Sequence, residues 1–60
     1  MDKQKHIVDG YYVMLWGGGR YNSIAWYKHL AEANKHIQHL LMIGAWAGMP
    51  PTVEVSFKRM

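Results

Sequence analysis

The sequence predicts a small α+β domain with the element order β-β-α-β and a three-stranded antiparallel sheet in the order 2-1-3. Three observations lead to this fold: a β-prone first segment interrupted by Asp9-Gly10, a helical period in the middle, and a two-residue alternation near the end. The 60 residues leave room for a single domain, residues 1–60, and half of them are apolar, which is enough to order the chain.

The first segment, residues 3–16, is rich in β-branched and aromatic side chains. Asp-Gly between two such runs favours a two-residue type I′ turn, because both residues tolerate positive φ. Asp9-Gly10 therefore predicts a hairpin of two strands, Lys3 to Val8 and Tyr11 to Trp16. The alternative is one long strand with a bulge at the glycine.

A helix follows the glycine run Gly17-Gly18-Gly19, with Asn22 or Ser23 as its capping residue. It is predicted to be amphipathic, about 22 residues long, and to end at Gly44 or Gly48, ahead of Pro50-Pro51. Its apolar stripe comprises Trp26, Leu30, Ala33, Ile37, Leu40, Leu41 and Gly44.

The last strand is predicted over residues 52–58, with Val53, Val55 and Phe57 on one side. A right-handed crossover through the helix places this strand antiparallel beside the first. One amphipathic helix covers only one face of the sheet. We assign Val53, Val55 and Phe57 to that covered face, together with Val13 and Leu15.

The other face of the sheet is then apolar and uncovered. A contiguous patch of this kind usually marks an interaction site, and aromatic and Met side chains are favoured at interface cores. Two alternatives are that the loop Ala45 to Pro51 folds over this face, or that two such sheets pack together in a homodimer. The residues predicted on it are Ile7, Tyr12, Met14 and Trp16.

The chain carries seven Lys and Arg against four Asp and Glu, a formal net charge of +3. Lys5, Arg20 and Arg59 are expected to form a charged rim around the apolar face, so that the partner would be a protein with an acidic contact surface. Basic and aromatic groups on an open sheet also suit nucleic acid, and a small homodimeric nucleic-acid-binding protein is the alternative.

Metal, cofactor and catalytic sites have little support. His29, His36, His39 and Glu32 share one arc of the predicted helix and are weak metal candidates, because a His beside an apolar stripe more often packs against the core. The chain has no Cys, and its glycine run lacks the spacing of a phosphate-binding loop. No nucleophile, base and orienting group can be nominated, so we expect neither an enzyme nor a cofactor.

The most apolar run, residues 40–51, is too short to span a bilayer, which needs about 20 residues, and no secretory signal pattern precedes it. We expect a cytoplasmic protein. In size, in surface aromatics and in lacking a recognisable active site, the chain resembles small phage or mobile-element proteins that inhibit a host enzyme. The functional hypothesis is therefore a non-enzymatic protein-binding module, an inhibitor that blocks a surface of a host nucleic-acid-handling enzyme.

Overall fold

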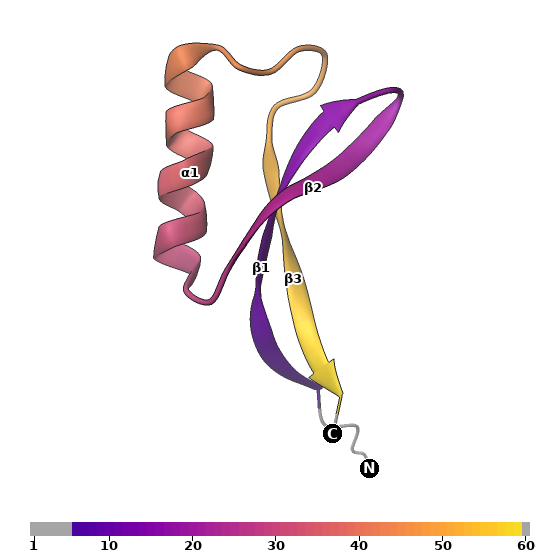
Figure 1. Ribbon diagram of the computed structural model, residues 1–60, viewed down its shortest axis with the longest axis vertical. Coiled ribbons are helices and arrows are strands. Elements are labelled where there is room, and N and C mark those ends of the chain that lie inside the picture. The colour runs from indigo at the N-terminus through magenta and orange to yellow at the C-terminus, as the bar shows by residue number, and fades with distance from the viewer. Residues whose placement is uncertain (1–5, 60) are drawn as a thin grey trace.

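The structure, a computed structural model, describes residues 6–59, without the side chains of His6 and Arg59. Its elements are β1 (His6–Gly17), β2 (Arg20–Tyr27), α1 (Leu30–Ile43) and β3 (Thr52–Arg59). The central strand β1 pairs antiparallel with both neighbours, which gives the order β2-β1-β3 (Figure 1). The predicted fold class and strand order are confirmed, although several element boundaries differ from the prediction.

The hairpin predicted at Asp9-Gly10 is wrong, because β1 runs straight through these residues. Its pairing with β3 passes from Val8 opposite Phe57 to Gly10 opposite Ser56, so that Asp9 is one extra residue, a bulge. Gly10 does not have the positive φ that a type I′ turn requires. The alternative of one long strand with a bulge is therefore the correct one.

The hairpin lies instead at Gly18 and Gly19, which connect β1 to β2. Their φ angles are +65° and +81°, and positive φ at both central residues is the mark of a type I′ turn. Gly-Gly satisfies this turn as well as Asp-Gly does, since glycine has no Cβ to clash in the left-handed region. The residues after the turn therefore form a second strand rather than the start of a helix.

Two substitutions at Gly18 should show whether the stability of the fold depends on the positive φ of this turn residue. Gly18→Val is expected to destabilise the fold by about 1–3 kcal/mol, because a β-branched residue is strained at positive φ. Gly18→Asn should be nearly neutral, since Asn tolerates this conformation. Urea unfolding followed by far-UV circular dichroism measures both, and equal midpoints for the two variants would contradict the assigned turn.

The helix begins later than the sequence predicted. Its N-cap is His29, in an extended conformation and without a side-chain capping bond, so neither Asn22 nor Ser23 caps it. Of the two predicted ends, Gly44 and Gly48, the helix ends at Gly44, which has a left-handed φ of 65°. The Ala45 N–H donates to the Leu40 carbonyl at 3.0 Å and the Gly44 N–H to the Leu41 carbonyl at 3.3 Å, the Schellman pattern.

The core is thin and lies between α1 and one face of the sheet. Its buried members are Val13, Ala33 and Leu40. Around them pack partly buried side chains from all four elements: Tyr11, Leu15, Ala25, Tyr27, Ile37 and Val53. The assignment of Val13, Leu15 and Val53 to the helix-covered face is therefore confirmed.

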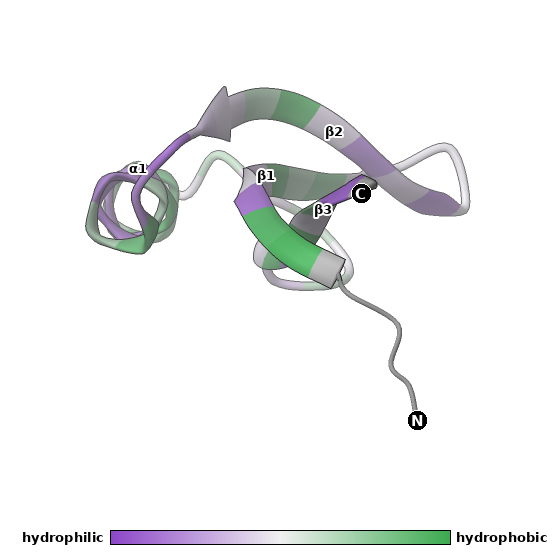
Figure 2. Ribbon diagram, turned by 90° about the horizontal axis from the view of Figure 1, so that it is seen from below, coloured by the Kyte–Doolittle hydropathy of each residue, from purple (hydrophilic) through white to green (hydrophobic). Residues whose placement is uncertain are grey.

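The helix leaves one end of the sheet uncovered. At 1.5 Å per residue the 14 residues of α1 span about 21 Å, whereas the 12 residues of β1 span about 40 Å. Figures 1 and 2 both place α1 to one side of the strands, and Figure 1 shows β1 and β3 continuing past it. Val55 and Phe57 stand on the same face as Val53, as predicted, but they lie on this extension beyond the helix and are exposed, Phe57 at 57%.

Candidate functional site

The open face of the sheet, the face opposite α1, carries a row of large side chains. Directly opposed residues of antiparallel strands share a face, and Tyr12 stands opposite both Trp26 and Glu54. The open face is thereby defined, in its central and hairpin-side parts, by Tyr12, Met14, Trp16, Tyr21, Trp26 and Glu54.

Tyr12 and Trp26 form the most accessible aromatic pair of this face. They stand opposite each other on β1 and β2, and 38% of Tyr12 and 43% of Trp26 is exposed. The indole of Trp26 lies over Gly10 so closely that a Cβ built there would overlap its ring. The missing side chain at Gly10 therefore leaves the space that the Trp26 indole occupies against β1.

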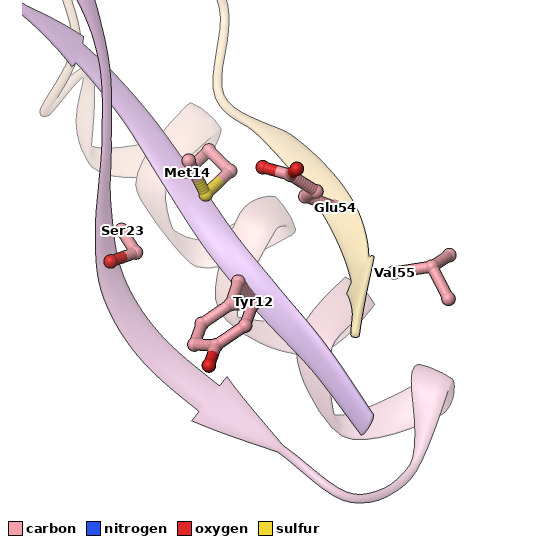
Figure 3. Close-up of a pocket in the computed structure, with 5 residues that line it drawn as sticks. All are labelled: Tyr12, Met14, Ser23, Glu54 and Val55. Carbon is pink, nitrogen blue, oxygen red and sulfur yellow. The ribbon is translucent and has the colours of Figure 1, made fainter. Parts of the chain in front are cut away.

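A hollow of about 250 Å³ opens beside this pair. Figure 3 shows Met14 and Glu54 pointing toward one another across β1 and β3, with Tyr12 and Ser23 on the β2 side and Val55 directed away at the outer edge. Its lining thus combines a thioether and an aromatic ring with a hydroxyl and a carboxylate. The hollow offers an apolar contact with hydrogen-bonding groups at its rim.

The hairpin end of the open face is closed by the loop between α1 and β3. Trp16 and Tyr21 meet edge to face, with ring centroids 5.1 Å apart, and the Tyr21 hydroxyl donates to the Pro50 carbonyl at 2.8 Å. Gly48 packs against the indole of Trp16, which a Cβ there would approach to 3.1 Å. The loop therefore covers Trp16, as the alternative in the sequence analysis proposed, but leaves Tyr12 and Trp26 accessible.

The structure brings together some of the predicted contact residues and separates others. Ile7 is exposed at the far end of the face, opposite Lys58, while Met14 and Trp16 are half-buried. Arg20 lies at the hairpin end opposite Gly17, at a register position on the helix side of the sheet. Lys5 lies outside the described residues; Arg59 pairs with His6 through the backbone, and its side chain is outside the description.

The sequence analysis did not predict Tyr21, Trp26 and Glu54 on the open face, and Trp26 is the most informative of these omissions. The helical spacing to Leu30 and Ala33 placed it in the helix, yet it stands on β2. The pattern that could have found it is the aromatic and β-branched run Tyr21 to Tyr27 immediately after two turn-forming glycines.

The predicted metal candidates His29, His36, His39 and Glu32 do not come together as a metal site in the structure. His36 Nδ1 and the Tyr27 hydroxyl share a hydrogen bond of 3.1 Å, and the two rings meet edge to face. His29 is the helix N-cap, and Glu32 and His39 are exposed. Within residues 6–59, no three His, Asp or Glu side chains are placed to hold a metal ion.

Comparisons with protein-family models, curated proteins and solved structures find no match for this chain. In the part of the chain that the structure describes, no helix is long and apolar enough to cross a membrane.

Proposed function

We propose that the chain is a non-enzymatic protein-binding module whose contact surface is the open face of the sheet. The observation that carries this proposal is the accessible Tyr12–Trp26 pair beside a hollow. Aromatic side chains are enriched at the energetic centres of interfaces, where they bury large areas with little loss of conformational freedom.

The size of the hollow supports a protein partner rather than a small substrate. Pockets for small molecules usually enclose about 300–1,000 Å³, whereas this one has about 250 Å³ and stands open on the sheet. Such a hollow suits one protruding apolar side chain of a partner. Ser23 and Glu54 at its rim accept hydrogen bonds from polar groups that flank that side chain.

The charge of the chain favours an acidic partner surface around that apolar contact. The net charge is +3, and the exposed Lys58 stands opposite Ile7 at the far end of the open face. Opposite net charges accelerate encounter and suppress wrong partners more than they add affinity. Glu54 at the centre of the face disfavours nucleic acid, because its carboxylate would stand beside any phosphate path across Tyr12.

The test is a selection of short random peptides on the immobilised full chain. We expect enriched peptides to carry one large apolar residue within an acidic context and to bind more weakly as salt rises. Their binding should fall at least tenfold with Tyr12→Ser plus Trp26→Ser and stay unchanged with Met42→Ser, which alters an exposed apolar residue of α1.

Chemical-shift mapping on the wild-type chain keeps the test independent of variant folding. Shifts on β1 and β2 around Tyr12 and Trp26 would support the proposal, and shifts confined to α1 would overturn it. The proposal would be overturned in favour of nucleic-acid binding if a dT oligonucleotide binds at about 50 mM salt and the selection yields no binding peptide.

A further inference from the structure

The outer edge of β3 has no inserted residue, because the bulge in its pairing with β1 lies on β1, at Asp9. β3 runs for eight residues at the border of the sheet, with β1 on its inner side. The other border strand, β2, has its pairing interrupted at Ile24, between Ala25 and Ser23. Bulges of this kind blunt an edge, whereas an uninterrupted edge presents backbone donors and acceptors in the geometry that another strand can use.

The side chains of β3 match those of a second β3 strand that runs antiparallel to it. If β3 pairs antiparallel with the same strand of a second copy, with Ser56 opposite Ser56, then Glu54 faces Lys58 and Val55 faces Phe57. We propose that two copies of this chain associate through β3 in this register, forming a continuous six-stranded sheet with the order β2-β1-β3-β3-β1-β2. Each unlike pair occurs twice, because the two-fold axis repeats it.

Neighbouring registers lack this complementarity. A pairing centred on Glu54 sets two carboxylates opposite each other, and one centred on Lys58 sets two ammonium groups opposite each other. Pairings centred on Val55 or Phe57 leave Glu54 opposite no cation within residues 52–58. Opposite charges across strands stabilise a pair and like charges destabilise it, so the charges select the register centred on Ser56.

The uncovered end of the sheet also favours a second copy as the occupant. The helix stops short of this end, where Val8, Val55 and Phe57 are exposed on the side that α1 covers elsewhere. Antiparallel pairing of β3 sets this end beside the helix-covered end of the other copy. Exposed Val55 then packs against exposed Phe57 across the junction, which removes apolar surface from water on both sides.

This association joins two copies through the backbone edge of β3, with its Glu54–Lys58 pairs on the open-face side, and it goes beyond the proposed function. Sedimentation equilibrium of the full chain should show a reversible dimer with a dissociation constant on the order of 10 µM, since a strand edge buries less than a standard interface. Glu54→Lys alone and Lys58→Glu alone should each raise that constant about tenfold or more, while the double exchange restores it. Glu32→Lys on α1 is the matched control and should leave it unchanged.

Cross-linking tests the register itself, because the chain has no cysteine of its own. Ser56→Cys should form a disulfide-linked dimer on oxidation, since opposed Cα atoms lie about 4.5–5.5 Å apart, within disulfide range. Ser23→Cys, exposed on β2, should not. The proposal would be overturned if the chain stays monomeric at a protein concentration 100-fold above the expected dissociation constant. It would also be overturned if the double exchange does not restore the dimer, or if Tyr12→Ser breaks the dimer while Glu54→Lys does not.

Discussion

Leu40→Ala is expected to remove a large part of the free energy of unfolding at 25 °C, about 2–5 kcal/mol. Leu40 is 7% exposed and shares the buried core with only Val13 and Ala33 among the described residues. Leu→Ala at such a site costs about 2–5 kcal/mol, whereas a 60-residue domain at about 0.05–0.15 kcal/mol per residue has about 3–9 kcal/mol in total. The loss is therefore comparable with the whole stability of the domain.

Far-UV circular dichroism with urea titration measures this loss. The matched control is Leu41→Ala, the same chemical change at the next helical residue, which is 45% exposed and should cost only about 1 kcal/mol. Both variants should be compared at low protein concentration, so that self-association adds little to stability. Equal urea midpoints for the two would show that the small core does not hold the fold together.

The two sequence signals for a turn explain why the first hairpin was misplaced. Asp9-Gly10 and Gly18-Gly19 both satisfy a type I′ turn and both follow β-prone residues, so local rules rank them equally. Contacts between distant residues decide between them: in the native fold Trp26 occupies the space above Gly10. The sequence alone does not reveal that contact, because it depends on β2 already lying beside β1.

The sequence nevertheless predicted correctly which side chains of the first segment share a face of the sheet. In the mispredicted hairpin, Val8 and Tyr11 pair across the turn and share a face. In the actual strand the extra residue Asp9 shifts the alternation by one, so Val8 and Tyr11 again share a face, opposite Phe57 and Val55. Ile7, Tyr12 and Met14 were accordingly placed together correctly, by a route that was wrong.

In the helix, the local sequence pattern predicted the core-facing residues correctly but did not predict where the helix begins. Ala33, Ile37 and Leu40 were predicted to face the core and do so, because their spacing follows the true helical period. The extension of that stripe back to Trp26 was a coincidence of spacing over residues that form β2. The coverage of Trp16 by the loop depends on the Tyr21–Pro50 hydrogen bond, a contact 29 residues apart in sequence that no local pattern encodes.

Gly10→Ala is expected to destabilise the fold by about 1–3 kcal/mol, a loss opposite in sign to what strand propensity alone predicts. Replacing a strand glycine by alanine normally stabilises by about 0.4–1 kcal/mol where the backbone accepts it, because the unfolded chain loses freedom. At Gly10 the new Cβ would overlap the Trp26 indole, so this ring, which reaches over from β2, would have to move away from β1. Gly17→Ala is the matched control in the same strand: its Cβ would meet only Asn22 Nδ2, at an ordinary 3.8 Å.

A double-mutant cycle with Trp26→Leu isolates the cause of that loss. With the indole removed, Gly10→Ala has no ring to displace, and its cost should disappear or reverse sign, a coupling of about 1–3 kcal/mol between the two positions. Gly17→Ala should show no coupling to Trp26→Leu, because it does not contact the indole. Urea unfolding of the four proteins in each cycle provides the measurement. If Gly10→Ala costs as much without the indole as with it, the strain lies in the backbone at the Asp9 bulge, and the glycine serves the bulge rather than the placement of Trp26 on the open face.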